Sequence, residues 1–543
     1  MTGPNNTILT ILLLIIPLST LVVWRRGQRK LTQPPRLGET IPFISNTWQF
    51  MTNKRLFIAR VRKALEVSPV VRCRLGPMDV HLVTGASNVS ALFRSSFTSD
   101  PWIVRILQHS AGYTPTDVAK FSKDVSGGSS LPRNESAGVP PPERRIWYAM
   151  HRAYDENMLG SGPVMAFATS FQAFFSQHLA KFPACEWVED VRIFDFFKQN
   201  MTVAATQAVL GPRMIDVNPG FVEAFWQYEK AVEPLAFGLP SWLHRRGVRA
   251  RNRLRAMCLK WYEIADQEFD WENLGPHHDA DWEPIFGSRI SKGLARWGKS
   301  FEFSAESMGA VYSLFLFGLH ANTIPICTWV IMHLIMNPDL FRDIKEEISK
   351  AEVTDSPTGQ SLNYQKLASL PLLQSVYTET LRLHVGVLIT RKSTESITLG
   401  EYTFPEGSVF QAPTAVSHLD ESIWGTPNHP ASEFWGYRHV KVVETRDNKG
   451  DITKSLSFSL TGRTGSFFPY GGGLSMCAGR NFAKPEVLLA VAMVVSRFEI
   501  EFMEWQKFDG SWSKQPASDD MEYANSVAAP PDRDMKVRWR RTC

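Results

Sequence analysis

The chain has 543 residues, of which 44% are hydrophobic and 12% aromatic, so it can bury a large core. Its 59 basic and 54 acidic residues leave a formal net charge of +5, which is too mild to indicate a nucleic-acid partner. Six cysteines are scattered singly along the chain, which argues against a disulfide framework, a zinc site or an iron–sulfur cluster.

The N-terminal part has the composition of a membrane anchor. Residues 7–24 carry no charge, and a helix of this length spans roughly 27 Å, close to the hydrocarbon core of a bilayer. Basic residues follow at 25, 26, 29 and 30, and the positive-inside rule places the chain after them in the cytosol. A cleaved signal peptide is the alternative, but no basic region precedes the run and no small-residue cleavage site follows it. The predicted segments are a short lumenal tail at 1–6, the anchor at 7–24, a basic and Pro-rich linker at 25–45 and one folded domain at 46–543.

The folded part reads as mainly α with small β-sheets. A helix is predicted at Arg55–Val67, followed by a hairpin of Val70–Leu75 and Val80–Val83 with Gly76-Pro77 in its turn. Residues 101–145 are rich in Ser, Gly and Pro, which predicts a long irregular connection. Residues 221–261 are helical, with an interruption at 237–243. The apolar, Trp-bearing interruption beside an arginine cluster suits a membrane surface, although most such apolar stripes simply face a core.

Three glycines and a cysteine form the most distinctive stretch of the chain, Phe467 to Arg480. Glycines permit backbone angles that a Cβ forbids, so this loop can curl around a sulfur and aim backbone N–H groups at it. The apolar run Asn481–Phe498 predicts a helix directly after it, whose N-terminus favours a negative charge. Cys477 is therefore a candidate thiolate ligand of a haem, against the alternative of a buried structural cysteine.

This loop resembles the haem-binding loop of the cytochromes P-450, whose pattern is Phe-x-x-Gly-x-Arg-x-Cys-x-Gly. Gly473, Cys477 and Gly479 match it, Tyr470 stands where Phe is usual, and Ser475 replaces the Arg. The resemblance implies the P-450 fold and makes Cys477 the axial ligand of the haem iron, with Tyr470, Gly473 and Gly479 as further cofactor-binding residues of the loop. The replacement at 475 removes a cation that would contact a haem propionate.

A second family motif lies in the predicted helix Leu370–Leu383. Glu379 and Arg382 are spaced i, i+3 and can pair on one face, which in general indicates only a solvated ion pair. In the family this Glu-x-x-Arg pair is buried and joined by a later arginine, for which the resemblance implies Arg438. Such a structural triad fixes the geometry of the loop more than it adds net stability.

The resemblance also implies residues that bind the haem propionates. The family carries Trp-x-x-x-Arg in the helix predicted at Trp147–Leu159, where this chain has Trp147, His151 and, one place on, Arg152. An ordinary amphipathic helix is the alternative. Arg391, which follows the apolar residues 385–389, is a further candidate for this contact.

The apolar segment Ser304–Met336 predicts a buried central helix. In the family this helix crosses the haem face and carries an acid and an alcohol that deliver protons to bound oxygen. Here Ala321 replaces the acid and Asn322 the alcohol, followed by Thr323, so Asn322 and Thr323 are the catalytic candidates. The run most resembles the branch that contains cholesterol 7α-hydroxylase and prostacyclin synthase. Pro325 should kink the helix and free a carbonyl near the oxygen site.

Together these motifs imply a haem-thiolate monooxygenase that inserts one oxygen atom from O2 into an apolar small molecule of terpenoid, steroid or polyketide type, as in fungal secondary metabolism. The resemblance implies NADPH as electron source, through a cytochrome reductase that docks on the proximal face near Arg480 and Lys484. It also implies a single-pass protein of the endoplasmic reticulum membrane with a cytosolic catalytic domain. Two alternatives remain: an isomerase that uses the same haem without reductase, and a non-catalytic haem-binding protein.

Removal of residues 1–30 should move the protein from the membrane fraction towards the soluble fraction, because the anchor supplies most of the apolar area buried in lipid. Fractionation of cells that express the full and the truncated chain measures this. Residual membrane binding through residues 237–243 is expected. Identical partitioning of the two proteins would contradict the anchor.

Overall fold

The structure is a computed structural model that describes residues 33–41, 44–133, 140–272, 275, 277–353, 361–446, 452–523 and 527–542. The anchor predicted at residues 7–24 lies outside these residues, as does the lumenal tail. The chain divides into two compact units, one formed by Met1–Thr98 and Thr390–Ala412, the other by Ser99–Ile389 and Pro413–Cys543. Each unit is described by itself below.

The smaller unit is built on a five-stranded sheet with strand order β1-β2-β12-β9-β3. β1 and β2 form the predicted hairpin, and Gly76 in its turn has a φ of +58°, which a glycine adopts without strain. β12 then pairs with β2 in parallel. The elements of this unit are α2 (Ser45–Thr52), α3 (Lys54–Val67), β1 (Val70–Leu75), β2 (Met78–Val83), α4 (Ala86–Ala91), β3 (Phe97–Thr98), β9 (Leu388–Ser393), β10 (Ile397–Leu399), β11 (Tyr402–Phe404) and β12 (Val409–Pro413).

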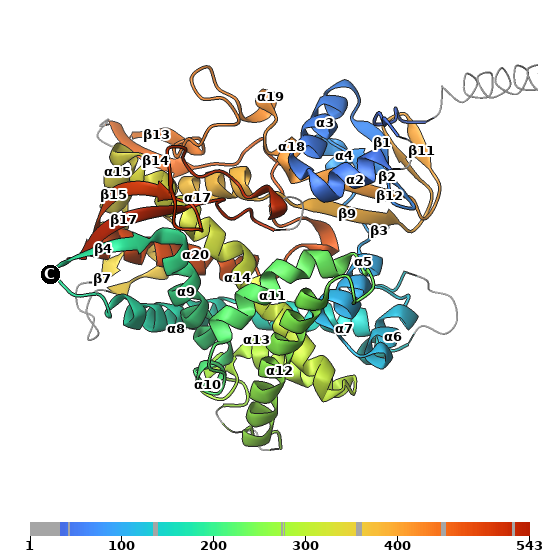
Figure 1. Ribbon diagram of the computed structural model, residues 1–543, viewed down its shortest axis with the longest axis horizontal. Helices are drawn as coiled ribbons and strands as arrows, with labels where there is room; N and C mark the ends of the chain where they lie inside the picture. Colours follow the sequence, from blue (N-terminus) through green and yellow to red (C-terminus); the bar gives the residue numbers. More distant parts are fainter. Residues whose placement is uncertain are drawn as a thin grey trace, which may run out of the picture. The chain divides into compact units, whose positions relative to one another are not determined.

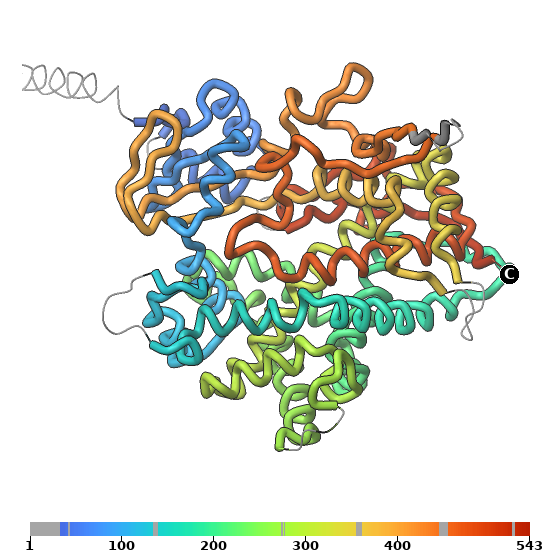
Figure 2. The backbone as a smooth tube through the Cα atoms, turned by 180° about the vertical axis from the view of Figure 1, so that it is seen from behind, coloured from blue at the N-terminus to red at the C-terminus, as the bar shows by residue number. Residues whose placement is uncertain are grey.

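The larger unit is mostly helical, and its helices surround α14 (Figure 1). Among them, α8 lies beside α20, as both ribbon and tube views show, and Phe167 of α8 stacks on Phe482 of α20 with ring centroids 4.4 Å apart (Figure 2). The helices are α5 (Asp100–Arg105), η2 (Ile106–Ala111), α6 (Pro115–Lys123), η3 (Pro142–Arg144), α7 (Ile146–Met158), α8 (Ser161–Leu179), α9 (Ile193–Leu210), α10 (Arg213–Asp216), α11 (Phe221–Ala236), α12 (Arg245–Glu268), α13 (Arg289–Ser300), α14 (Ala305–Ile335), α15 (Pro338–Ser349), α16 (Tyr364–Leu367), α17 (Pro371–His384), α18 (Thr414–Ser417), α19 (Glu421–Trp424), η4 (Gly473–Ser475), α20 (Arg480–Arg497) and η5 (Met521–Tyr523).

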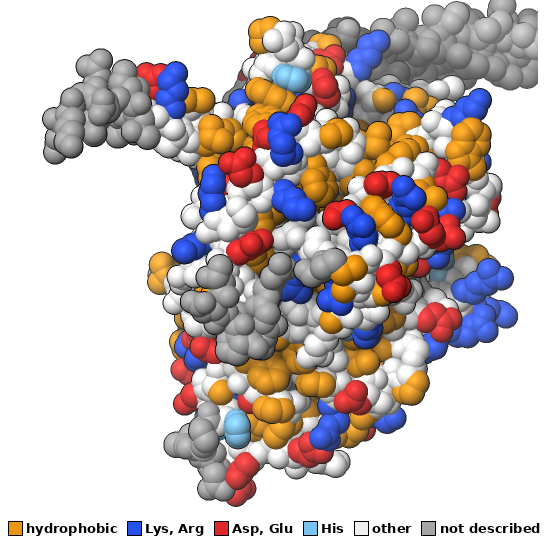
Figure 3. All heavy atoms as spheres, turned by 90° about the vertical axis from the view of Figure 1, so that its left-hand side faces the viewer, with side chains coloured by type: hydrophobic (Ala, Val, Ile, Leu, Met, Phe, Trp, Pro, Cys, Tyr) orange, Lys and Arg blue, Asp and Glu red, His pale blue; other side chains and the backbone are white. Residues whose placement is uncertain are grey.

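The larger unit also contains a four-stranded sheet with strand order β16-β15-β17-β4. Its outer residues pair across the strands, as Arg538 does with Glu501 at 2.6 Å and Arg540 with Glu499 at 2.5 Å. Figure 3 shows basic and acidic side chains interspersed on the side of the molecule that carries this sheet. The strands of this unit are β4 (Trp187–Arg192), β5 (Trp282–Glu283), β6 (Gly287–Ser288), β7 (Glu352–Val353), β8 (Ser361–Leu362), β13 (Val440–Arg446), β14 (Ile452–Phe458), β15 (Phe498–Gln506), β16 (Trp512–Ser513) and β17 (Asp534–Arg541).

The central helix α14 forms where the sequence predicts it. Ser304 caps its first turn by accepting the N–H of Ser307, and the helix continues through Pro325 to Ile335. Because proline has no N–H, the carbonyl of Ala321 has no partner four residues on. Within the described residues α14 alone is long and apolar enough to cross a membrane, but 78% of its most apolar window is buried inside the protein. It is therefore the core helix of this unit.

The prediction of an irregular connection at residues 101–145 is wrong over much of its length. The segment contains α5, η2 and α6, the last of which is capped by Thr114 and begins with Pro115, a favourable first residue of a helix. The following loop is held by the buried Arg145, whose guanidinium donates to the carbonyls of Gly127, Ser129 and Ser130. Such caps and carbonyl contacts allow a segment rich in Ser, Gly and Pro to be ordered.

A buried charge network joins α17 to the chain that follows α19. The carboxylate of Glu379 accepts two bonds from Arg382, at 2.7 and 2.8 Å, and one from Arg438 at 2.8 Å. His439 Nε2 lies 3.2 Å from the same carboxylate, and all four side chains are buried. Burial opposes the charge on Glu379, but the bonds from Arg382 and His439 hold its pKa well below its usual range. The structure thus brings the three predicted residues together and adds a fourth, His439.

Replacement of Glu379 by Gln should lower the free energy of unfolding by about 3–5 kcal/mol, because it leaves two buried guanidinium groups without their counter-charge. Denaturant unfolding measures the difference. Arg342→Gln is the control: its side chain pairs with Asp339 on the exposed side of α15, and its loss should have little effect. Equal unfolding midpoints for Glu379→Gln and the parent would show that the network does not hold the fold.

Candidate active site

The loop that carries Cys477 is a tight turn fixed by its own backbone. The N–H of Cys477 donates to the carbonyl of Tyr470 at 3.0 Å, and Gly471 donates to Phe468 at 3.0 Å. Gly471 and Gly473 have φ of +70° and +67°, a region in which other residues are strained. The two glycines are therefore required by the turn that brings residue 477 back against residue 470.

Side chains on both sides anchor this turn. The hydroxyl of Tyr470 is hydrogen-bonded to that of Tyr377 on α17. Ser475, which stands where the family has Arg, is hydrogen-bonded to Ser99 through their hydroxyls at 2.8 Å. The Ser475 side chain thus helps to hold the loop in place and supplies no cation.

Cys477 differs from the other free cysteines that the structure describes. Cys73, Cys258 and Cys327 are buried, whereas Cys477 is exposed, and Cys185 is disulfide-bonded. Although accessible, Cys477 is surrounded by enough protein that burial raises the pKa of its thiol, while the backbone N–H groups of Gly479 and Arg480 lower it. An accessible sulfur that receives backbone N–H bonds suits a metal ligand better than a packed core thiol does.

His418 connects this loop to the buried charge network. Its carbonyl accepts a bond from Arg382 Nη1 at 2.7 Å, and its ring nitrogen Nε2 accepts the N–H of Phe468 at 3.1 Å. The ring is fully buried, and burial lowers its pKa to about 3, so it is neutral and able to accept. The sequence places a histidine here but gives no sign of this role.

The three candidates for propionate contacts on α7 differ in their burial and in their hydrogen-bond partners. The indole N–H of the buried Trp147 already donates to the carbonyl of Phe121 at 3.1 Å. Burial lowers the pKa of the His151 imidazole, which makes it a neutral donor near pH 7. Arg152 pairs with Glu156 on the exposed side of the helix. The structure therefore does not bring these three side chains together. Because it is partly buried and makes no ion pair with a described residue, His151 stays the best-placed candidate on α7 for a propionate contact.

Arg391 belongs to the smaller unit, on β9. Its guanidinium lies over the ring of Phe93, 5.9 Å from the centroid, and donates to the carbonyl of Thr390. Its contact with a propionate stays a prediction.

Asn322 and Thr323 point to different sides of α14. The side-chain oxygen of Asn322 accepts the backbone N–H of Ala528 at 2.9 Å, which assigns its amide nitrogen to the other direction. The hydroxyl of Thr323 lies 2.7 Å from the carbonyl of Leu319 and 3.2 Å from Glu486 Oε1 on α20. Asn322 is half-buried and Thr323 is buried, so only the amide is accessible.

Glu486 is a site residue that the sequence analysis missed. It is fully buried, burial raises its pKa well above the usual range, and its second oxygen has no partner among the described residues. Burial thus favours the neutral form of this carboxyl, and in that form it can donate to Thr323 while the Thr323 hydroxyl donates to the carbonyl of Leu319. The signal in the sequence is the one acidic residue of α20, which stands directly before the apolar run of its second half.

Comparisons with known proteins agree with this geometry. Residues 213–515 match the family model of cytochrome P450. The chain is 40% identical over 512 residues to cytochrome P450 monooxygenase calL of Penicillium decumbens, which covers 94% of this chain and 93% of the relative. It is 27% identical to the cholesterol 7-alpha-monooxygenase of Cricetulus griseus, covering 96% and 95%. The solved structure of retinoic acid-bound cyanobacterial CYP120A1 shares the fold, with a TM-score of 0.66, 17% identity, and coverage of 94% of this chain and 100% of the other.

The fold and the cysteine loop define a haem-thiolate oxidoreductase. The chain belongs to the cytochrome P450 family and is a monooxygenase that takes electrons from NADPH through a reductase. The residues fit the cofactor, because the accessible sulfur of Cys477 can ligate iron and the backbone N–H groups of Gly479 and Arg480 can stabilise the thiolate.

Cys477→Ala should abolish the thiolate-type band in the reduced carbon monoxide difference spectrum, because no other side chain of the loop can supply a charged sulfur. Cys258→Ala is the matched control, since this cysteine is buried in the helical core and should leave the band in place. A thiolate-type band in the Cys477 variant would refute the assignment.

Proposed function

We propose that this enzyme inserts one oxygen atom into an apolar small molecule of terpenoid, steroid or polyketide type in fungal secondary metabolism. The observation that carries the proposal is the accessible face of α14, together with the similarity to named fungal monooxygenases. A second relative, cytochrome P450 monooxygenase fsoE of Humicola fuscoatra, is 27% identical over 95% of this chain and 89% of its own length.

The accessible face of α14 is apolar except at one end. From Ser307 to Met332 nearly every residue is buried, and the four that are not are Leu314, Phe317, Gly318 and Asn322. Their spacing of three and four residues places them on one side of the helix. A Cβ built on Gly318 would meet no atom within 4 Å, so this side borders open space. Such a surface accommodates an apolar substrate next to a single amide.

Asn322 presents only a donor to that space. Its oxygen is engaged with Ala528, so the group that remains is the amide N–H₂. Ala528 is itself fixed, because Val385 pairs with it and Ala529 donates to the carbonyl of His384 at 2.8 Å. The amide is therefore held in one orientation and can donate to a water or to a substrate oxygen, but it cannot relay a proton in the way a hydroxyl can.

Glu486 and Thr323 provide the proton supply that the alanine at 321 lacks. The haem, when bound, supplies the activation of O2 with electrons from the reductase. A neutral Glu486 holds a proton one hydrogen bond from Thr323 Oγ1, which lies one residue along the helix from Asn322. Because Thr323 and Asn322 face different sides of α14, the path from this carboxyl to the substrate side would need waters that pass around the helix to the amide of Asn322.

Rearrangement without reductase is the second candidate function, because the branch that this helix resembles has asparagine at the position of Asn322 both in an oxygen-inserting hydroxylase and in an isomerase. Oxygen insertion is favoured here by the buried carboxyl of Glu486, 3.2 Å from Thr323 Oγ1, since an isomerisation that conserves all atoms needs no net proton delivery. The names of two relatives, the monooxygenase calL and the cholesterol 7-alpha-monooxygenase, support the same choice.

The proposal also includes the membrane and the reductase. The anchor at 7–24 would hold it in the endoplasmic reticulum membrane with the catalytic part in the cytosol. The reductase would dock near Arg480 and Lys484. Arg480 donates to the carbonyl of Cys477 at 2.8 Å, and Lys484 is half-buried with its amine 3.0 Å from Gln374, so Arg480 offers the more accessible charge.

Turnover should require NADPH, reductase and O2, and Asn322→Ala should release more hydrogen peroxide for each product formed, because the ordered donor near the oxygen site is lost. Peroxide and product are measured in a reconstituted system. Product formation at full rate without reductase or O2 would establish the isomerase instead.

Two companion variants separate the roles of these residues. Asn322→Asp keeps an acceptor for the Ala528 N–H while removing the amide donor, so peroxide release should rise in it as it does in Asn322→Ala. Glu486→Gln keeps the size of the side chain but holds no acidic proton, and should slow product formation with the substrate affinity unchanged. Full activity of Glu486→Gln would exclude it as the proton source.

A further inference from the structure

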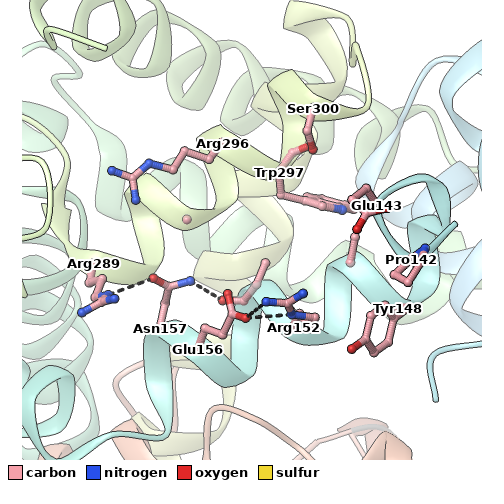
Figure 4. A pocket seen from close by; sticks show the side chains of 13 residues that line it. Pro142, Glu143, Tyr148, Arg152, Glu156, Asn157, Arg289, Arg296, Trp297 and Ser300 are labelled. Carbon is pink, nitrogen blue, oxygen red and sulfur yellow. Dashed lines mark hydrogen bonds and ion pairs between the residues drawn. The ribbon is translucent and has the colours of Figure 1, made fainter. Parts of the chain in front are cut away.

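A groove of about 320 Å³ lies between α7 and α13, and η3 closes one of its ends (Figure 4). None of its lining residues belongs to the cysteine loop or to α14, so it is separate from the active site. It is lined by Pro142, Glu143, Tyr148, Ala149, Arg152, Ala153, Glu156, Asn157, Arg289, Gly293, Arg296, Trp297 and Ser300.

Both helices contribute one regular face to this groove. α13 presents residues 289, 293, 296, 297 and 300, and α7 presents residues 149, 152, 153 and 156, each with the spacing of one helix side. At one point the helices touch, because a Cβ on Gly293 would lie 2.5 Å from Asn157 Nδ2. The opposite side of α7 carries Trp147 and His151, whereas Arg152, the third candidate for a propionate contact, faces the groove.

Three arginines line the groove, and they differ in how their charge is balanced. Arg152 is paired with Glu156, and Arg289 lies 3.4 Å from Asp281. Arg296 makes no ion pair with any residue that the structure describes, and donates only to the carbonyl of His278 at 2.8 Å. Burial and the charge of Arg289 lower the pKa of Arg296, although Asp279 opposes this. A bound anion would remove this unfavourable interaction.

Trp297 adds a buried donor that has no acceptor. The side chain is 5% exposed, its ring packs edge-to-face on Phe303 at 4.9 Å, and its Nε1–H has no partner within the described part of the chain. In Figure 4 the nitrogen is at the end of the indole nearest Glu143 and η3. A buried donor without an acceptor is unfavourable, and an acceptor bound in the groove would satisfy it.

We propose that this groove binds a small organic acid. The carboxylate would accept from Trp297 Nε1–H and from the guanidinium of Arg296, while the carbon skeleton would lie against Ala149 and Ala153. The site offers more donors than acceptors, it is partly apolar, and its volume suits a ligand of about the size of an aromatic acid.

Glu143 is the competing occupant from within the chain. It lies on η3 at the rim of the groove and is exposed, and no bond joins it to Trp297. A turn of its side chain would let its carboxylate take the place of the ligand. Removal of this charge should therefore strengthen the binding of an external acid or leave it unchanged.

The test is calorimetric titration of the haem-loaded full chain in detergent with benzoate, and with benzamide as the neutral analogue. Benzoate should bind saturably and benzamide much more weakly. Trp297→Phe keeps an aromatic ring and removes the N–H donor, and Arg296→Gln removes the charge. Each of these two single variants should weaken benzoate binding at least about tenfold. Arg342→Gln, on a distant helix, should bind as the parent does. The reduced carbon monoxide spectrum of each variant checks that it is folded.

Several results would overturn the proposal. These are the absence of saturable benzoate binding, equal affinity for benzamide, unchanged affinity in both groove variants, and loss of binding in Glu143→Gln. Benzoate bound at the haem-side pocket would persist in Trp297→Phe, so the measurement also distinguishes the groove from the active site.

Discussion

The carboxylate of Glu379 is the group on which the cysteine loop depends. A buried negative charge is tolerated only when it is fully paired and hydrogen-bonded, and here two guanidinium groups and a histidine surround it. Both arginines also donate to backbone carbonyls, Arg382 to Ala431 and Arg438 to Glu433. The charge thereby fixes the otherwise irregular chain between α19 and β13. A hydrophobic cluster could supply similar stability, but it could not direct individual carbonyls.

The same geometry continues into the iron-binding turn. Arg382 holds the carbonyl of His418, and the neutral His418 ring accepts the N–H of Phe468, which is where the turn begins. The turn closes on itself through the bond from Cys477 N–H to Tyr470. Each of these bonds is made by a group that burial keeps in one protonation state. The position of the sulfur is therefore determined by hydrogen bonds that do not change with pH near neutrality.

The elements were predictable where one physical signal dominates. The length and apolar composition of segment 304–336 predict a buried helix. The glycines at 471 and 473 indicate a tight turn, and both have a positive φ in the structure. The relative directions of Asn322 and Thr323 were not predictable, because they depend on which neighbours pack against each side of α14. The contact between Glu486 and Thr323 was not predictable for the same reason, because it depends on the packing of α20 against α14. The helices within 101–145 were missed because their caps and the contacts of Arg145 outweigh a composition typical of loops.

The two sides of α14 carry different polar groups. In the family an acid on this helix lies at the haem face, whereas here the carboxyl next to the helix is Glu486, which lies in the contact with α20. Consecutive residues of a helix differ by about 100° in direction, so Thr323 can face the dry contact with α20 while Asn322 faces the accessible side. Burial against α14 raises the pKa of Glu486, and the amide, which does not titrate, takes the half-buried position on the accessible side. In the proposed mechanism, the proton that the acid at 321 would supply therefore comes from the α20 side of the helix.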